Sequence, residues 1–594
     1  MRQLDSIAVY NAYLLGARKV IEHKNLLNKI NVFPVADGDT GSNLFSMMNS
    51  IIHEAKIGNT VKRTMESIAE AALMGARGNS GLIFAGYLGG MSRAIWDEEI
   101  ISIENFAQAN QEAVRYAYEA IENPVEGTMI TLMKEWAKHL NELVKEGEFS
   151  EKPLSEIEER LEYTLSLTKD QLPELKKAGV VDSGAKGFVY FIKGIIESFH
   201  GKHSEKEVFE EEDEDATFQE LDVHQVGEET LTHRFCTEVL IRGTEIDTLQ
   251  LKESLKEYGD SLVVAGSSNK ARIHLHTNDP ASLIERLTAR YHVIYQKIDD
   301  MKRQQEMVHH KKYKIALITD SIADLPMDFI DEEQIHMINL NILLGETTFL
   351  DKLTINTKKL FELAKDKREH PTSSQPDLKR IENLYQYLLT YYEEIVVLTV
   401  SKELSGTYNN MNKVAQSFVQ KGHRIEVVDT KQNSGAQGLI VMEVAKAIKQ
   451  EVNFEQVVAL AKQLAERSRI LVTIKTIEPM IRSGRLSVNA GKVAKFIGLK
   501  PVITLTDGKG AIDAISFSQK GSVKQVVNHM RKILRSNQIK TYSIVHVNNE
   551  EEAKQFAEIF TKVIGKEPAY IDQCSSVIGV GAGQGAVALS YILE

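Results

Sequence analysis

The string NVFPVADGDTGSNL, residues 31–44, is the densest motif in the chain. Asp37 and Asp39 flank a glycine in it, so in an irregular loop both carboxylates can turn toward one cation. The apolar helix LFSMM begins directly behind three small residues that offer backbone N–H groups: Gly41, Ser42 and Asn43. Hard oxygen ligands beside a helix N-terminus suit a magnesium phosphate group. A single Asp-Gly pair is also common as a turn that caps a helix.

Three further glycine-rich strings follow in the first 200 residues: GARGNSG (75–81), PVEGTMIT (124–131) and KAGVVDSGAKGF (177–188). They lie between stretches whose apolar residues recur at helical spacing, such as Leu154, Ile157, Leu161 and Leu165. We see no strand in this region and expect an all-helical domain. The amides and Ser80 of the second string could cradle phosphates, although a tight turn between helices explains that string alone equally well.

In this order, the strings DGDTGSN, GARGNSG, PVEGT and VVDSGAKG resemble the nucleotide-binding domain of the dihydroxyacetone kinase family, in the version found in the ATP-binding subunit of bacterial fatty acid kinase. The resemblance covers about residues 1–200 and implies a DhaL-like barrel of antiparallel helices that holds ATP and Mg²⁺. It implies that the metal lies at Asn31, Asp37 and Asp39, the two aspartates being the catalytic pair. It also implies contacts of phosphates with Ser42, Asn43, Gly78, Asn79, Ser80 and Thr128, and of the nucleotide loop with Asp182 and Gly184.

An acidic segment separates this region from the next. Residues 205–215, EKEVFEEEDED, hold eight acidic residues and one lysine, and like charges repel and cannot pack. We therefore interpret 201–229 as a solvated linker. The β-type runs FCTEVLI, SLVVAG and ARIHLHT follow, mixed with helical patterns, which predicts a small α+β domain over 230–310.

A cysteine and two histidines in this small domain have the spacing of a metal site. If 271–277 is a strand, His274 and His276 project from the same face. With the thiolate of Cys236 from a neighbouring strand they would form a three-ligand zinc site with an open position. Isolated histidines are more often structural. The strings CTE and IHLHTNDP also resemble the middle domain of the ATP-binding subunit of fatty acid kinase, which implies functionally important histidines and Zn²⁺ here.

From Tyr313 to the end, continuous apolar runs alternate with helical patterns. The runs are YKIALITDS (313–321), EIVVLTVS (394–401), HRIEVVDT (423–430), RILVTI (469–474), PVITLT (501–506) and TYSIVHV (541–547). Strands that are apolar on both faces and separated by helices indicate a parallel sheet covered on both sides. We therefore predict an α/β domain over 313–594.

This half resembles the DegV family, the fatty-acid-binding subunit of the same kinase, in ITDSIADLP (318–326), TSSQP (372–376), SGTYNN (405–410), TIEPMIRSGRLS (476–487) and GLKPVITLTDG (498–508). The resemblance implies a fatty acid ligand. Loop hydroxyls could hydrogen-bond its carboxylate and an arginine could supply charge. The candidate residues are Ser373, Ser374, Ser405, Gly406, Thr407 and Arg485, although each Ser or Thr alone is equally a cap or turn residue.

The chain departs from the DegV pattern at two places. Ser373 replaces the usual threonine, which keeps a hydroxyl. The family typically ends with His-Thr-Gly-Pro-Gly, whereas Gly581 and Ala582 of VIGVGAGQG (577–585) occupy the His and Thr positions here. The resemblance puts that histidine near the acyl headgroup, so we expect binding to survive and acyl phosphate formation to be weakened.

Composition limits the class of protein. The 594 residues carry 71 Lys and Arg against 83 Asp and Glu, a net charge of −12, which argues against nucleic acid as the main ligand. Two cysteines indicate a reducing compartment. The N-terminus lacks the apolar core of a secretion signal, and no run approaches the roughly 20 apolar residues of a membrane span. We expect a cytoplasmic protein of several domains.

These observations predict an ATP-dependent fatty acid kinase that phosphorylates the carboxylate of a fatty acid held by its own DegV-like half, giving acyl phosphate. A lipid-binding carrier or sensor regulated by nucleotide, without catalysis, is the alternative that the missing histidine favours. A dihydroxyacetone kinase is a weaker alternative, because no string resembles its ketone-binding domain. The resemblance further implies a homodimer and, as partners, a separate acyl-binding protein or an acyltransferase.

Overall fold

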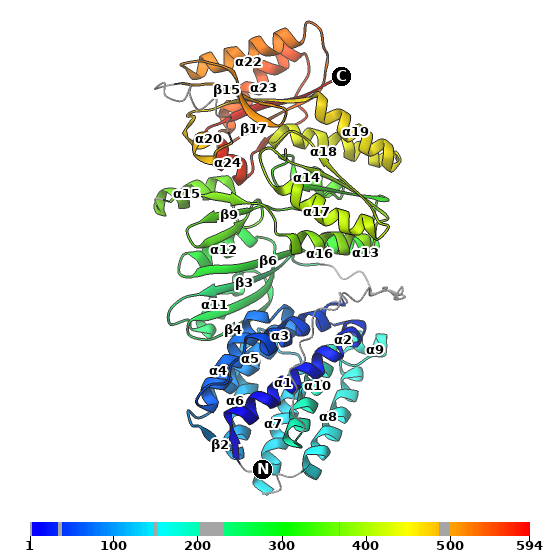
Figure 1. Cartoon of the computed structure of the whole chain (residues 1–594), viewed down its shortest axis with the longest axis vertical. Coiled ribbons are helices and arrows are strands. Elements are labelled where there is room, and N and C mark those ends of the chain that lie inside the picture. The colour runs from blue at the N-terminus through cyan, green and yellow to red at the C-terminus, as the bar shows by residue number, and fades with distance from the viewer. Residues whose placement is uncertain (1–2, 34–37, 147–150, 202–230, 368, 486–498) are drawn as a thin grey trace. The chain divides into compact units, whose positions relative to one another are not determined.

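The computed structural model of the chain describes residues 3–33, 38–146, 151–201, 231–367, 369–485 and 499–594 (Figure 1). They form two compact units, Met1–Met301 and Lys302–Glu594. In these ranges no helix is both long enough and apolar enough to cross a membrane.

The first domain is a closed ring of helices. Each of α1, α3, α4, α5, α6, α7, α8 and α10 packs on the next, and α10 packs back on α1. A Cβ on Gly194 would lie 2.6 Å from the backbone of Gly16, so only glycine allows α1 and α10 to approach this closely. The helices are α1 (Ser6–Glu22), α2 (Lys24–Lys29), α3 (Thr40–Glu54), α4 (Val61–Gly75), α5 (Gly78–Ala94), α6 (Ile103–Ala120), α7 (Met129–Glu146), α8 (Glu151–Gln171), α9 (Pro173–Ala178) and α10 (Ser183–Phe199).

The expected helical domain is confirmed, with one difference. Two three-residue strands, β1 (Gln3–Asp5) and β2 (Ile100–Ser102), pair antiparallel before α1 and α6. They are too short to show a period of two in the sequence. Asp5 and Ser102, the last residues of these strands, cap the helices that follow by accepting hydrogen bonds from Ala8 N and Asn105 N.

The middle domain is a four-stranded antiparallel sheet in the order β4-β5-β3-β6, as the three predicted strands indicated. Its elements are β3 (Phe235–Arg242), α11 (Thr248–Leu255), the 3₁₀ helix η1 (Lys256–Tyr258), β4 (Asp260–Gly266), β5 (Lys270–Thr277), α12 (Pro280–Thr288) and β6 (His292–Asp300). The sheet packs on the helical domain through β4, whose Val263 and Ala265 belong to the same hydrophobic core as the helices.

The second unit contains a parallel sheet of four strands in the order β13-β12-β7-β8. Its strands are β7 (Ile315–Asp320), β8 (His336–Ile338), β12 (Glu394–Thr399) and β13 (Arg424–Asp429). A small sheet, in the order β10-β9-β11, is built from β9 (Asn341–Leu344), β10 (Thr347–Leu350) and β11 (Thr372–Ser374).

The prediction of one parallel sheet is wrong for the strands after residue 467. The runs 469–474, 501–506 and 541–547 lie in a separate six-stranded sheet, ordered β16-β15-β14-β19-β17-β18, in which every pair except β17 with β18 is antiparallel. The strands are β14 (Ser468–Thr473), β15 (Val502–Thr506), β16 (Lys509–Ala514), β17 (Ile539–His546), β18 (Ile571–Gln573) and β19 (Val587–Leu593). A continuous apolar run reports burial on both faces, and it carries no information about strand direction.

Helices separate and cover these two larger sheets. α18 contacts strands of both sheets, α16 and α17 pack on the parallel sheet, and α22 and α23 cover the six-stranded sheet. The helices of this unit are α13 (Met301–His309), α14 (Met327–Glu332), α15 (Thr357–Lys367), α16 (Leu378–Leu389), α17 (Thr407–Gln420), α18 (Ser434–Lys449), α19 (Phe454–Arg467), α20 (Glu478–Ser483), α22 (Gln519–Ile533), α23 (Glu550–Ile564) and α24 (Ser576–Ala582).

Candidate functional site

The four glycine-rich strings of the helical domain lead into the N-termini of α3, α5, α7 and α10, and these ends meet. A Cβ on Gly78 would lie 2.6 Å from Nδ2 of Asn43. A Cβ on Gly184 would lie 3.1 Å from Oγ of Ser80 and 3.1 Å from Cε of Met129. Helix N-termini present unpaired N–H groups and the positive end of the helix dipole, so four of them together favour a polyphosphate.

A buried carboxyl lies where two of these helices begin. Asp182 caps α10, its Oδ1 accepting a 2.7 Å hydrogen bond from Ala185 N, and its carboxyl also faces the backbone of Met129 at the start of α7. Thr168 Oγ1 accepts a 3.1 Å bond from the Asp182 backbone N–H. Burial raises the pKa of Asp182 to about 7, although both backbone N–H groups act against the rise.

Two of the three predicted metal ligands lie in the described part of the chain. Asp39 precedes α3 at its N-cap, and Asn31 is buried at 5% exposure. Asp37 lies outside the described residues. Asn28 was missed by the sequence analysis: its Oδ1 accepts a 2.9 Å hydrogen bond from Ser42 N, and its Nδ2 donates to Ser42 Oγ at 3.0 Å. No local pattern marks Asn28, which lies in the last turn of another helix, α2.

One polar atom in this cradle lacks a protein partner. The side-chain oxygen of Asn79, in the first turn of α5, is buried and accepts no hydrogen bond from any described residue. A buried amide oxygen without a donor fits a bound cation or a ligand hydroxyl. Thr128, by contrast, donates its hydroxyl to Val125 O at 2.7 Å and so belongs to the turn before α7.

The structure brings the predicted Cys and His residues together. Cys236 pairs with His276 across β3 and β5, and the ligand atoms of Cys236, His274 and His276 all lie within 4.8 Å of one another. Sγ of Cys236 is 3.9 Å from Nδ1 of His274. One thiolate and two imidazoles at these distances fit a tetrahedral Zn²⁺ with one further position.

A second layer of side chains surrounds this cluster. Asp260 Oδ1 lies 3.6 Å from Nδ1 of His276, and its Oδ2 lies 2.9 Å from Nδ1 of His233. Carboxylates in this position orient metal-ligating imidazoles. His274 is 4% exposed, and its Nε2 has no hydrogen-bond partner among the described residues.

The second unit encloses a cavity of about 440 Å³, within the usual range for small-molecule sites. Apolar side chains line most of it. They come from the six-stranded sheet (Ile470, Val472, Ile503, Leu505 and Val545), from Val547 just after β17, and from α24 (Ile578). Such a wall excludes water and offers no hydrogen bonds. The cavity therefore suits an aliphatic chain.

Polar residues of the predicted site gather on the same cavity. Ser373, Ser374, Ser405, Gly406 and Arg485 line it, together with Gly581. Gln375 also lines it and was missed, although it lies in the TSSQP string; its side-chain amide packs against Gly406.

Thr407 is the one predicted acyl-site residue that does not line the cavity. It is fully buried at the start of α17, where Thr407 Oγ1 lies 2.9 Å from Oγ of Ser405. The backbone N–H of Thr407 also donates to Ser405 Oγ at 3.3 Å, so Thr407 contacts the Ser405 hydroxyl twice.

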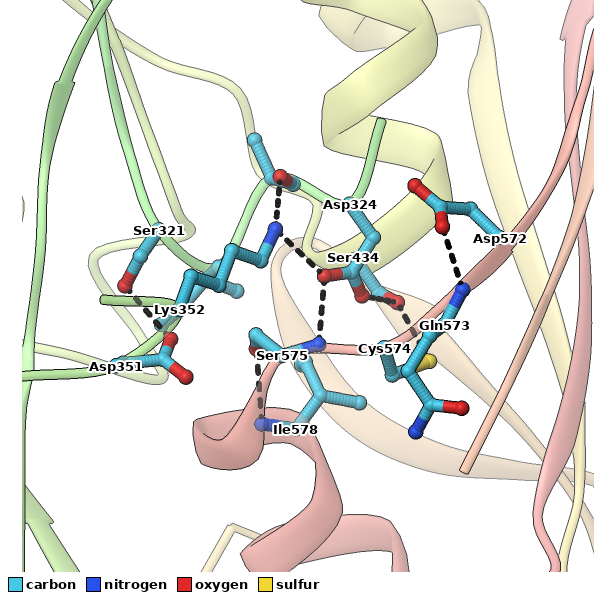
Figure 2. Close-up of polar contacts among 12 residues, drawn as sticks. Ser321, Asp324, Asp351, Lys352, Ser434, Asp572, Gln573, Cys574, Ser575 and Ile578 are labelled. Carbon is cyan, nitrogen blue, oxygen red and sulfur yellow. Dashed lines mark hydrogen bonds and ion pairs between the residues drawn. The ribbon is translucent and has the colours of Figure 1, made fainter. Parts of the chain in front are cut away.

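A buried polar network includes two residues that line the cavity, Ser434 and Cys574 (Figure 2). The Lys352 ammonium lies 3.1 Å from Asp324 Oδ1, which also accepts a 2.8 Å bond from Ser575 N. Ser434 Oγ donates to Asp324 Oδ2 at 2.6 Å and lies 3.6 Å from the Cys574 thiol. Because Asp324 bonds both Ser434, at the start of α18, and Ser575, just before α24, it links the starts of these two helices.

A second carboxyl of this network carries a shifted pKa. Asp351 accepts 2.7 Å hydrogen bonds from Ser321 Oγ and from Ser576 N. Burial raises the pKa of Asp351 to about 6, even though Lys352 and these donors favour its charged form. Burial lowers the pKa of Lys352, but Asp324 and Asp351 outweigh that effect and hold it above its ordinary value.

The chain is similar to several curated proteins. It is 31% identical over 325 residues to protein YloV of Bacillus subtilis strain 168, which covers 53% of this chain and 59% of YloV. It is 28% identical over 330 residues to a protein of Staphylococcus epidermidis strain ATCC 12228, covering 52% of this chain and 60% of the relative. The match thus spans less than two thirds of these relatives.

Two solved structures resemble the second half. A fatty-acid-binding DegV family protein from Thermus thermophilus matches with a TM-score of 0.45 and 23% identity, covering 47% of this chain and 100% of that protein. DegV, a fatty acid binding protein from Bacillus subtilis, matches with a TM-score of 0.44 and 23% identity, covering 48% and 100%.

Sequence models of three families match consecutive parts of the chain. A DAK2 domain matches residues 34–197, the FakA-like middle domain of fatty acid kinase matches 232–308, and the DegV family matches 314–594. The first match covers the converging helix N-termini, the second the Cys and His cluster, and the third the apolar cavity. The chain is therefore a fusion of a DAK2 domain, a FakA-like middle domain and a DegV-family domain.

Proposed function

We propose that the protein is an ATP-dependent fatty acid kinase that transfers the γ-phosphoryl group to the carboxylate of a fatty acid bound in its own DegV-family domain. The observation that carries the proposal is that one chain holds both a cradle of four helix N-termini and an apolar cavity with polar residues on its wall. The first suits a polyphosphate and the second an aliphatic acid.

Phosphoryl transfer depends mainly on positioning and on neutralising charge, so no protein nucleophile is required. A fatty acid carboxylate oxygen attacks the γ-phosphorus, the bond from that phosphorus to the β,γ-bridging oxygen breaks, and ADP leaves. Asp37, Asp39 and Asn31 would hold Mg²⁺, which supplies positive charge at the phosphates. Asn43, Gly78 and Ser80 would orient the phosphate chain.

On the acyl side, the cavity residues hold the reacting group. The hydroxyls of Ser373, Ser374 and Ser405 would donate to the carboxylate, and Arg485 would add positive charge. The apolar walls fix the chain and exclude water, which protects an acyl phosphate from hydrolysis.

In the middle domain, Cys236, His274 and His276 would hold Zn²⁺. We also propose a cytoplasmic location, on the basis of the composition, and a homodimer with a separate acyl-binding protein or acyltransferase as partners, on the basis of the family resemblance.

The test combines lipid identification with product trapping. Lipid extracted from the purified protein is identified by mass spectrometry, and the protein is then incubated with Mg-ATP and hydroxylamine, which converts acyl phosphate into a hydroxamate. We expect bound fatty acid and a hydroxamate product. Absence of product with fatty acid bound would contradict the kinase proposal.

The variant Asp39→Asn checks the metal assignment. It removes the negative charge with which Asp39 would hold Mg²⁺. We therefore expect hydroxamate formation to fall at least 100-fold, while the amount of bound lipid stays unchanged. Asp97→Asn is the control, because Asp97 is exposed and follows the far end of α5. The asparagine keeps a side-chain oxygen that can accept the hydrogen bond from Thr60. Normal turnover in Asp39→Asn would refute the assignment.

The second candidate function is a lipid carrier or sensor that binds nucleotide without catalysis. Gly581 favours it, because the DegV string to which the tail is similar has a histidine there. Fatty acid bound without hydroxamate formation, together with an ATP-dependent change in lipid exchange, would support this alternative.

A further inference from the structure

The middle domain contacts the helical domain directly at the glycine-rich loop 75–81. The backbone of Glu122 donates to Leu262 O at 3.0 Å, and Ile121 forms an isolated antiparallel bridge with Val263, so β4 is fixed to the end of α6. Two charged side chains of the neighbouring strands then reach the loop itself.

Glu238, in β3, holds the start of α5. Its side chain is buried at 4% exposure, and its Oε1 accepts a 2.6 Å hydrogen bond from the backbone N–H of Gly78. Gly78 is the first residue of α5 and has a φ of +59°, a left-handed conformation that glycine adopts readily. A carboxylate at this position is stabilised by the positive end of the 17-residue helix.

Arg272, in β5, holds the other side of the same loop. It is 3% exposed, and its Nη1 donates to Met74 O at 2.8 Å and to Leu73 O at 3.3 Å, in the last turn of α4. Its Nη2 lies 3.6 Å from Oε2 of Glu238. The two charges therefore secure the end of one helix and the start of the next, with residues 75–78 between them.

The same carboxylate also faces the Cys and His cluster. Glu238 pairs with His274 across β3 and β5, and its Oε1 lies 3.8 Å from Nδ1 of His274. One oxygen atom therefore faces both a backbone N–H of the nucleotide loop and a metal-site imidazole.

We propose that Glu238 and Arg272 are positioning residues that set the loop 75–81 for nucleotide binding, and that Glu238 couples nucleotide affinity to metal occupancy of the Cys236, His274 and His276 cluster. A buried ion pair is a weak source of stability, since desolvation offsets its attraction. The contacts of Glu238 with the start of α5 and of Arg272 with the end of α4 instead favour a role in setting the conformation of the loop between these helices. The inference rests on the proposed nucleotide site but not on transfer to a fatty acid.

The first test measures the loop. Hydrogen exchange of amides 76–81 is followed in the full chain without nucleotide, in Glu238→Ala and in Glu238→Gln. We expect at least tenfold faster exchange in Glu238→Ala, and an intermediate rate in Glu238→Gln, because glutamine keeps an oxygen acceptor for Gly78. The control is Glu70→Gln, which removes the ion pair of α4 with Lys270 at the same domain contact. Unchanged exchange in Glu238→Ala would overturn the positioning role.

The second test measures coupling. The affinity for a non-hydrolysable Mg-ATP analogue is measured by calorimetry in zinc-loaded and chelator-treated protein. We expect zinc removal to weaken binding at least fivefold in the wild type and in Glu70→Gln, and to change it less than twofold in Glu238→Gln. Nucleotide must then raise the zinc affinity by the same factor. Equal effects of zinc in Glu238→Gln and the wild type, or no effect of zinc in the wild type, would overturn the coupling.

The results also separate this inference from the proposed function. Faster loop exchange and zinc-dependent nucleotide affinity, without hydroxamate formation, would support the positioning role and contradict the kinase. Hydroxamate formation with unchanged loop exchange in Glu238→Ala and a wild-type zinc effect in Glu238→Gln would support the kinase and contradict this inference.

Discussion

At the scale of single residues, Gly581 occupies the position at which the resemblance to the DegV string leads us to expect a histidine. It lies in α24 on the cavity wall, and nothing lies within 4 Å of a Cβ placed on it. A Cβ at this position therefore meets no neighbouring atom.

We predict that Gly581→His strengthens fatty acid binding about tenfold, or about 1.4 kcal/mol, because an imidazole adds a hydrogen-bond donor for the carboxylate. Gly581→Ala is the control, since it makes the same backbone change without the donor. Titration with a fluorescent fatty acid provides the measurement. Equal affinities of the two variants would contradict the prediction.

Titration of Asp351 makes the free energy of unfolding of the second unit depend on pH. Its pKa is about 6 in the folded protein against 3.8 ordinarily, so the folded state binds the proton more tightly. The stabilisation from this group is therefore complete below about pH 4. As the pH rises through 6, the free energy of unfolding falls by up to about 3 kcal/mol.

We predict that Asp351→Asn, which stays neutral, gains stability relative to the wild type as pH rises from 4 to 7. Thermal melting of both proteins at several pH values gives the difference. A difference that is independent of pH would show that Asp351 does not titrate in this range.

At the scale of elements, the N-terminus of α5 depends on a glycine for its shape. Gly78 has a positive φ, and a Cβ there would lie 2.6 Å from Nδ2 of Asn43. Gly89, in the interior of the same helix, has nothing within 4 Å of its Cβ position.

We predict that Gly78→Ala destabilises the protein by about 1 kcal/mol or more and weakens ATP binding at least tenfold, because it displaces Asn43 and strains the loop. Gly89→Ala is the matched control and should stabilise the protein by about 0.5–1 kcal/mol with normal ATP binding. Chemical denaturation and calorimetry measure the two effects. Unchanged ATP affinity in Gly78→Ala would remove this loop from the nucleotide site.

At the scale of the whole molecule, covalent linkage of two domains raises the effective concentration of each domain at the other. Asp39→Asn should lack phosphoryl transfer and retain lipid. A second variant, Ser405→Ala with Arg485→Ala, should lack lipid and retain the nucleotide site.

We propose that transfer occurs within one chain, because covalent linkage favours it, and we therefore predict that an equimolar mixture of these two variants stays below a tenth of wild-type hydroxamate formation. A wild-type sample diluted to the same active concentration is the control. Recovery toward wild-type rates would show transfer between chains instead.

The sequence by itself determined which parts of the chain are helical and which contain strands, and it predicted a chemistry for each domain. Period-two spacing put His274 and His276 on one strand face, and glycine strings marked four helix starts, because such patterns act over a few residues. Burial on both faces also identified three of the strands after residue 467, β14, β15 and β17, but not β16, β18 and β19, and the direction of these strands depends on how distant segments connect.

Only the tertiary structure decided which distant groups meet. The convergence of four helix ends, the contact of Asn28 with Ser42, the packing of Gln375 on Gly406, and the clamp of Glu238 and Arg272 on the loop 75–81 all join residues from separate elements. Glu238 and Gly78 lie 160 residues apart in the chain. Neither residue carries a local signal of the other, because a contact of this kind arises only when the middle sheet packs on the helices.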